Sequence, residues 1–417
     1  MKKLARAFLV VAFIFAISSG AFVAGIVVSP AAQHVLHREQ SLSPRVSPSA
    51  SAEADTSVFW EAWNIVQHQY YGNPVGQQTL LRGAIEGLVN ALDDPYSAYL
   101  TSDEVAGSQS ELNGDLQSLG MAIEKRDGRL VVVAALAGSP AQRAGIQSGD
   151  LIARIGSRDT ASLTLSDALS LLRGPAGSRV SLTIMRGDSA PLIVDVNRDS
   201  LTIPLVTGRM LSDDIAYLQI AAVVASAPRD VITVLQQLTD QEPRGLVLDL
   251  RNNPGGFLDA AVEIAGQFIA DGTIVSQHTR DGVITWSYSD NGKVLIVAGP
   301  DGKQAIPVRN TAMATDIKLV VLVNRGTASA AEVLAAALQE RGQAILVGER
   351  TFGKGSVSGD YVLSDGSSVH ITNGQWLSPT GRNVSGQGLM PDIPIQDSPG
   401  DNDAILARGI EYLLTGH

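Results

Sequence analysis

The N-terminal pattern is an uncharged apolar run, Ala7–Val28, that follows the basic residues Lys2, Lys3 and Arg6. Its length is close to the roughly 20 residues that a helix needs to span a hydrocarbon core. The apolar part of a cleaved signal peptide is usually shorter. The pattern therefore favours an uncleaved anchor within residues 1–30, with a cleaved signal segment as the alternative. Because a positive flank stays in the cytoplasm, the rest of the chain is expected on the periplasmic or extracellular side. Cleavage would make the protein secreted.

Two patterns follow the apolar run. Residues 31–57 become rich in Ser, Pro and Ala, which predicts a flexible linker. Apolar residues then recur at helical spacing over Val58–Leu92, with a Gly-Asn-Pro break at 72–74. This predicts two helices in an N-terminal helical region, residues 58–113. Their apolar faces are expected to pack against the rest of the chain or against a second copy.

Short apolar runs bounded by turn residues mark residues 114–199, which predicts a β-rich domain. The expected strands are Gly120–Glu124, Leu130–Ala135, Asp150–Ile155, Arg179–Arg186 and Leu192–Asn197, and the expected short helices are Ala141–Ala144 and Leu165–Leu172.

Strand and helix patterns alternate over residues 200–398, which predicts an α/β core with a mixed sheet. Residues 271–315 carry three hairpin signals and are expected to leave that core. An amphipathic helix near Asp403–Leu414 is expected within residues 399–417. The predicted core strands are Gly245–Leu250, Lys318–Val323 and Ala344–Val347, and the predicted core helices are Leu258–Ile269 and Ala328–Arg341. The fold class is thus an α/β core with an inserted β-rich domain and an N-terminal helical region.

Composition excludes several classes of function. The chain has 417 residues and a formal net charge of −11, whereas a nucleic-acid-binding protein normally carries a basic face. Cysteine is absent, which excludes disulfides, thiolate metal sites and a cysteine nucleophile.

The most informative segment is the small-residue stretch that joins the strand ending at Val323 to the following helix. Ser329 lies at this strand-to-helix corner. Unpaired backbone N–H groups and the positive end of a helix meet at such a corner, which suits a nucleophile and an oxyanion. A helix N-cap without chemistry is the alternative, because Ser favours that position.

A second candidate is Lys354, which lies between Gly353 and Gly355. Burial would lower the pKa of its ammonium, and a neutral amine can take a proton from a serine. An exposed turn lysine is one alternative. A phosphate-binding loop is another, but the P-loop pattern requires Ser or Thr where Gly355 stands, and it requires a helix afterwards.

The segment Asp249–Gly256, DLRNNPGG, lies between a strand and a helix. Its two glycines could expose N–H groups to an anion and complete an oxyanion hole with the N–H of Ala330. A simple tight turn is the alternative.

The six histidines give little support for a histidine base. His278 falls in the predicted hairpin region and His370 in a strand pattern, and core or surface positions explain the histidines better. No two of them have ligand spacing with a carboxylate, so we expect no metal and no cofactor.

Together these segments resemble the carboxyl-terminal processing proteases, also called tail-specific proteases, a family of Ser-Lys peptidases with a PDZ domain. The likeness runs from about Val58 to Leu414. It rests on DDPYSAYL (93–100), AGSPAQRAGIQSGDLIARIG (137–156), LRGPAGSRVSLTIMR (172–186), DLRNNPGG (249–256), LVNRGTASAAE (322–332), GERTFGKGSV (348–357) and LSPTGRNVSGQGLMPDI (377–393).

The resemblance implies Ser329 as the nucleophile and Lys354 as the general base, at the family's usual spacing. It implies the N–H groups of Ala330 and Gly255 as oxyanion donors. It also implies an accessory carboxylate, Glu340. The family usually has a Gln that orients the lysine, and in this chain Ser358 takes its place.

The resemblance also makes residues 114–199 a PDZ-like domain that binds the C-terminus of a substrate. Leu119, Gly120, Met121, Ala122 and Ile123 match the carboxylate-binding loop and the strand after it. Their backbone N–H groups could hold a terminal carboxylate while the tail adds as a strand, and their apolar side chains would accept an apolar last residue. A strand that only packs a core is the alternative.

The expected function is therefore an exported serine endopeptidase that cleaves proteins at or near apolar C-terminal tails. The expected partners are protein or peptide substrates, bound through their C-termini, and a membrane, bound through the N-terminal segment. No nucleic acid is expected as a partner, and the sequence leaves open whether the chain forms a homo-oligomer. The alternative is a catalytically degenerate PDZ scaffold that binds tails without cleaving them.

Overall fold

The computed structural model describes residues 55–94, 96–106, 119–126, 128–163, 165–187, 189–199, 205–396 and 403–417. The anchor predicted within residues 1–30 lies outside these ranges. Among the helices within them, none combines the length and apolar character needed to cross a bilayer.

The central sheet has the strand order β19-β16-β15-β10-β9-β8. Its neighbouring strands are parallel, except that β8 runs antiparallel to β9, so the predicted mixed sheet is confirmed. The residues of β10 and β15 are all buried, as expected for parallel strands that are covered on both faces. The strands are β8 (Val206–Met210), β9 (Ile215–Ile220), β10 (Gly245–Asp249), β15 (Leu319–Val323), β16 (Ala344–Gly348) and β19 (Ile393–Pro394).

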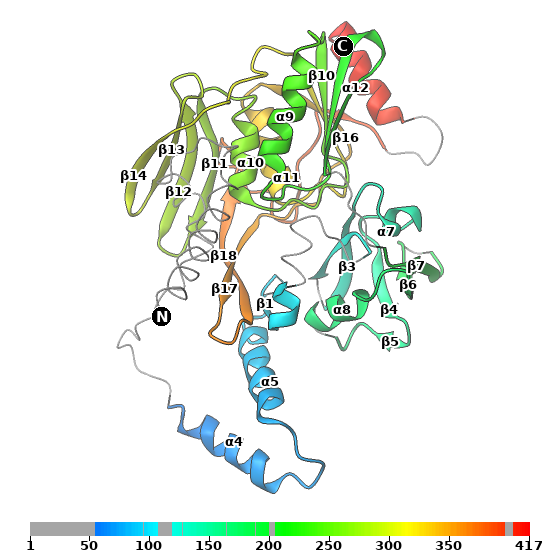
Figure 1. Ribbon diagram of the computed structural model, residues 1–417, viewed down its shortest axis with the longest axis vertical. Helices are drawn as coiled ribbons and strands as arrows, with labels where there is room; N and C mark the ends of the chain where they lie inside the picture. Colours follow the sequence, from blue (N-terminus) through cyan, green and yellow to red (C-terminus); the bar gives the residue numbers. More distant parts are fainter. Residues whose placement is uncertain are drawn as a thin grey trace, which may run out of the picture.

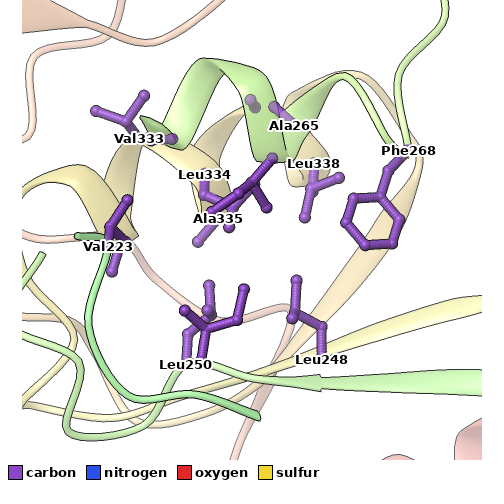
Figure 2. Close-up of a cluster of buried hydrophobic side chains, with 14 of the residues drawn as sticks. Val223, Leu248, Leu250, Ala265, Phe268, Val333, Leu334, Ala335 and Leu338 are labelled. Atoms are coloured by element: carbon purple, nitrogen blue, oxygen red, sulfur yellow. The ribbon is translucent and has the colours of Figure 1, made fainter. Parts of the chain in front are cut away.

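Helices cover both faces of this sheet (Figure 1). One face packs against α9, α10 and α11, and the other packs against α12. Figure 2 shows the first layer, where Leu338 of α11 lies over Leu248 of β10. The helices are α9 (Ala227–Thr239), α10 (Leu258–Ala265), α11 (Ala330–Glu340) and α12 (Ala404–Thr415), with a 3-10 turn at Ser212–Asp214.

The helix α10 ends at Ala265, four residues before the predicted end at Ile269. The carbonyls of Gly266 and Gln267 accept hydrogen bonds from the backbone N–H groups of Ala312 and Ala314. The helix ends at Ala265 because the chain then tightens into turns, in which the N–H groups of Gln267 and Phe268 donate to the carbonyls of Ile264 and Ala265.

A second, antiparallel sheet has the order β1-β18-β11-β12-β13-β14, with β17 paired to β18. The three hairpins predicted within residues 271–315 are confirmed. They do not form an isolated excursion, because β11 pairs with β18. The strands are β1 (Ala98–Leu100), β11 (Gly272–Thr279), β12 (Gly282–Ser289), β13 (Val294–Gly299), β14 (Gly302–Pro307), β17 (Ser356–Val362) and β18 (Ser368–Leu377).

The β-rich domain has its own sheet and its own hydrophobic core. The sheet order is β2-β3-β4-β6-β7, with β5 paired to β4, so β2 is an edge strand. The elements are β2 (Met121–Arg126), β3 (Arg129–Ala135), α7 (Pro140–Arg143), β4 (Leu151–Ile155), β5 (Arg158–Asp159), α8 (Leu165–Leu172), β6 (Arg179–Met185) and β7 (Leu192–Asn197).

The chain contributes a strand, β1, to the second sheet before it forms the β-rich domain. The helices α4 (Ser57–Gln69) and α5 (Gln77–Asn90) come first, and β1 then pairs with β18. The β-rich domain follows, and β8 returns to the central sheet, so the predicted insertion is confirmed. The N-terminal region is not wholly helical, since β1 belongs to it. Figure 1 shows α4 extending away from the rest of the molecule, and no residue of α4 is buried.

Candidate active site

Three loops meet at one edge of the central sheet. The strands β10, β15 and β16 are parallel neighbours, so the loops that follow them leave from the same carboxyl edge. These loops carry Gly255, Ser329 and Lys354 respectively. The carboxyl ends of parallel strands are the usual place for a site in a sheet of this kind.

The backbone of Ser329 is held in an unusual conformation. Its φ is 52° and its ψ is −122°, at the N-cap position of α11. A side chain other than glycine is strained there, so the surroundings must hold it in place. The N–H of Ala328 donates to the carbonyl of Asn253 at 2.9 Å, and the Thr327 hydroxyl donates to the carbonyl of Leu250 at 2.8 Å. The serine loop is thereby fixed onto the loop after β10.

Gly255 lies directly against this corner. With a φ of +96°, it adopts a conformation that favours glycine, and an added Cβ would lie 2.8 Å from the Ala330 nitrogen. Its own N–H donates to the Asn253 side-chain oxygen at 2.9 Å. The N–H of Ala330 has no acceptor among the described residues. Of the two donors suggested by the sequence, the N–H of Ala330 is therefore unpaired among the described residues, and that of Gly255 is engaged.

Lys354 lies two residues before β17, and its side chain is partly buried. Burial lowers the pKa of its ammonium, because desolvation disfavours the charge, while nearby carboxylates act in the opposite direction. Its Nζ lies 5.2 Å from the centre of the Tyr96 ring. Its carbonyl accepts a hydrogen bond of 2.9 Å from the Trp376 indole. Gly353 must be small, since an added Cβ would lie 2.7 Å from the Gly388 nitrogen.

Glu332 joins the serine loop to the lysine loop and is a residue that the sequence analysis missed. One carboxylate oxygen, Oε2, accepts the backbone N–H groups of Ser329 and Lys354, each at 2.9 Å. The other, Oε1, accepts the Thr351 hydroxyl and the Gly353 N–H. Glu332 is fully buried, and burial raises its pKa while the accepted hydrogen bonds act against this. The pattern Ser-x-x-Glu at a helix start was the available signal.

Ser329 and Lys354 lie on neighbouring loops whose backbones are joined through Glu332. In the described structure, no hydrogen bond joins their two side chains. Catalytic hydrogen bonds are often long without substrate and shorten when it binds.

The two accessory candidates make no hydrogen bond to Ser329 or Lys354 in the described part of the chain. Glu340 is at the opposite end of α11 from Ser329, about 16 Å along the helix axis at about 1.5 Å per residue. It pairs with Arg382 at 2.9 Å and accepts the N–H of Thr380. Ser358 lies on β17, and its buried hydroxyl has no hydrogen-bond partner among the described residues.

A second polar network fixes the start of α12. The Arg251 guanidinium contacts the Asp249 carboxylate at 2.6 Å and the Asp403 carboxylate at 2.7 Å, and Asp403 caps α12. The Tyr217 hydroxyl also donates to Asp249 at 2.7 Å. These contacts hold the DLRNNPGG loop against the sheet.

The alternatives raised by the sequence fit the structure poorly. Strand β17 begins at Ser356, where a phosphate-binding loop would require a helix. His370 lies on β18 and contacts Asp360 at 2.7 Å, and His278 lies on β11. In the part of the chain that the structure describes, there is no cluster of three or more side chains suited to a metal ion.

Of the residues proposed to hold a substrate tail, Leu119 and Gly120 precede β2, and Met121, Ala122 and Ile123 are its first three residues. Gly120 has a φ of +66°, and a Cβ there would lie 2.4 Å from the Ser139 Cβ, so a glycine is required. Its carbonyl accepts the N–H of Leu136. Leu119 is buried, and Met121 and Ile123 pack partly against the domain core. Because β2 is an edge strand, its outer side can pair with a further strand.

Known proteins share the combination of this α/β core with the inserted β-rich domain. The model described as Peptidase family S41 matches residues 214–395, and a PDZ domain model matches residues 131–186. A carboxyl-terminal-processing protease of Synechocystis sp. is 34% identical over 351 residues, which is 82% of this chain and 77% of that protein. The carboxy-terminal processing protease CtpA of Bacillus subtilis is 30% identical, over 80% of this chain and 67% of its own.

The chain belongs to the carboxyl-terminal processing protease family. It is a serine peptidase of family S41 with a PDZ domain. The solved photosystem II D1 C-terminal processing protease has the same fold, with a TM-score of 0.64 and 27% identity, over 85% of this chain and 90% of that one. A model described as the activating protease CtpB N-terminal domain matches residues 15–104.

Proposed function

We propose that this family member is a Ser-Lys endopeptidase in which Ser329 is the nucleophile and Lys354 is the general base. The observation that carries the proposal is the shared carboxylate oxygen of Glu332, which binds the backbone of both residues. A partly buried lysine with a lowered pKa, held beside a strained serine at a helix start, has the chemistry that this reaction needs.

The reaction follows from these groups. Neutral Lys354 takes the proton of the Ser329 hydroxyl as the oxygen attacks the scissile carbonyl. The N–H of Ala330 stabilises the tetrahedral oxyanion, and Gly255 can add a second donor if Asn253 releases it. The lysine then gives its proton to the leaving amine. Water hydrolyses the acyl-enzyme with the lysine again acting as base.

We infer that the substrate is a protein with an apolar C-terminal tail. The tail would add to the free edge of β2, with its carboxylate at the backbone N–H groups near Leu119 and Gly120. Met121 and Ile123 would contact its apolar side chains. We also propose export and membrane anchoring, supported by the basic and apolar pattern of residues 1–30.

Cleavage of an unfolded protein such as casein tests the proposal. Ser329→Ala, Lys354→Ala and Lys354→Arg should each lower kcat/KM by at least about a thousandfold, because the members of such a unit act together. Lys354→Arg keeps the charge but cannot supply a neutral amine. Fragments produced by any of the three at the wild-type rate would rule out the dyad.

The second candidate is a PDZ scaffold that binds tails without cleaving them. The engaged N–H of Gly255 and the unpartnered hydroxyl of Ser358 favour it. A wild-type protein that binds an apolar tail peptide but yields no casein fragments at any pH would establish this candidate instead.

A further inference from the structure

A cluster of ionisable groups lies where the PDZ domain meets the candidate base. The PDZ strand β2 contributes Glu124 and Arg126, and the segment before β1 contributes Asp94 and Tyr96. Lys354 is the remaining member, and the carboxylates of Glu124 and Asp94 both act on its charge. Nothing in the reaction proposed above uses Glu124.

Glu124 is an unusual side chain for a domain surface. It is 4% exposed, although glutamate is almost never buried without a partner. Side chains alternate along a strand, so Glu124 faces away from its neighbour Ile123, which packs on the core of the PDZ domain. Glu124 therefore points out of its own domain.

The partners of this carboxylate are few. The Arg126 guanidinium lies 2.8 Å from Oε1 as an ion pair. In the described structure neither carboxylate oxygen accepts a hydrogen bond of regular geometry. Burial raises the pKa of Glu124, while the positive charges of Arg126 and Lys354 act against this. The ionised carboxylate is therefore stabilised by its two positive neighbours, and it stabilises their charge in return.

Arg126 fixes the position of β2 against the lysine loop. Its guanidinium stacks over the Phe352 ring at 4.4 Å, and Phe352 lies two residues before Lys354. The N–H of Phe352 donates to the carbonyl of Thr327 in the serine loop at 2.9 Å. The strand that would receive a substrate tail is thus docked on the catalytic loops.

We propose that Glu124 is a positioning residue of the active site: supplied by the PDZ domain, its buried carboxylate favours the protonated form of the Lys354 amine over the neutral form that acts as the base. The proposal rests on the proposed role of Lys354. It makes the base strength of the protease core depend on a residue of another domain.

The other charged groups around Lys354 are less able than Glu124 to stabilise the protonated form of its amine. Glu332 acts on Lys354 from α11, but its carboxylate already accepts four hydrogen bonds. Asp94 accepts the Ser97 hydroxyl and the Tyr96 N–H. Arg126 opposes Glu124, but its side chain is 40% exposed, so water screens its charge. Tyr96 faces the amine with its ring.

The experiment measures the pH dependence of kcat/KM in Glu124→Gln, which keeps the shape of the side chain and removes its charge. An opposite charge within reach raises a lysine pKa by about 1 unit or more. The acidic limb should therefore move to lower pH by about 1 unit, which is about a tenfold gain in kcat/KM on that limb. Glu124→Asp retains the charge and should leave the limb near the wild-type position.

Asp195→Asn is the matched control, because it removes one carboxylate from an exposed position on β7 of the same domain. An unchanged limb in Glu124→Gln, a limb moved to higher pH, or an equal shift in Asp195→Asn would each overturn the proposal.

A second measurement does not depend on cleavage. In full-length Ser329→Ala protein, acetylation of Lys354 by acetic anhydride is followed against pH by peptide mass spectrometry, with and without Glu124→Gln. Acetylation of Lys354 should begin at lower pH in the protein that carries Glu124→Gln. Identical curves of acetylation against pH in the two proteins would refute the role of Glu124. If the curves differ while the wild-type protein cleaves nothing, the proposed function fails and the electrostatic coupling stands.

Discussion

Glu332 is the side chain whose replacement most directly tests the arrangement of the site. In Glu332→Gln, one of the two oxygens becomes an NH₂ group, which is a donor. If the amide oxygen stays with Thr351 and Gly353, the NH₂ faces the backbone N–H groups of Ser329 and Lys354. The opposite orientation leaves the Gly353 N–H facing a donor instead. Either way, buried N–H groups lose their acceptor.

The magnitude follows from those lost contacts. A buried donor left unpaired costs about 1–3 kcal/mol, so the free energy of unfolding falls by about 1–3 kcal/mol if one N–H loses its acceptor and by about 2–6 kcal/mol if two do. The two loops also lose the oxygen that joins them. A misplacement of about 1 Å between reacting groups costs about a hundredfold in rate. We therefore expect kcat/KM to fall at least about a hundredfold while the fold persists.

The assay pairs urea denaturation with kcat/KM on an unfolded peptide substrate. Glu340→Gln is the control, since Glu340 lies on the same helix and contacts Arg382 and Thr380 rather than either catalytic loop. It should lose about 1–2 kcal/mol of stability and keep its kcat/KM. Wild-type kcat/KM in Glu332→Gln would refute the reasoning, and so would an equal loss in Glu340→Gln.

Two further predictions concern stability. Arg251→Met leaves the carboxylates of Asp249 and Asp403 without their shared cation. Urea denaturation should show that the free energy of unfolding falls by about 3–5 kcal/mol. An unchanged denaturation midpoint would show that this network contributes little to stability. Burial, with a smaller contribution from Asp259, raises the pKa of Glu263 from 4.5 to about 7. Because the folded state then binds the extra proton, the free energy of unfolding should fall by up to about 3 kcal/mol as the pH rises through that interval. Denaturation at about pH 5 and about pH 8 measures the slope, which Glu263→Gln should abolish.

Much of the fold could be predicted from local pattern. The alternation over residues 200–398 predicted the central sheet, and the strand Leu192–Asn197 and the helix Leu165–Leu172 were predicted with their observed bounds. The predicted end of α10 was wrong, because the chain tightens into turns after Ala265 although Phe268 and Ile269 continue the apolar pattern. Apolar spacing does not distinguish a last helical turn from such tighter turns.

Within the site, Ser329, Lys354 and Gly255 could be identified as candidates, because small residues and glycines at strand ends are visible in a single sequence. The N–H of Gly255 is engaged by Asn253, which no spacing could indicate. Glu332 was overlooked because its pattern is also that of an ordinary helix cap. Glu124 gave no signal, since a charged residue in an edge strand normally faces water.

The sequence by itself determined which segments become strands, helices and tight turns, because these depend on the side chains of neighbouring residues. Only the tertiary structure decided which of them meet. The parallel register of β10, β15 and β16 brings three loops to one edge, and the docking of β2 buries Glu124 beside them. The strength of the base depends on burial and on charges from distant segments, and those are properties of packing.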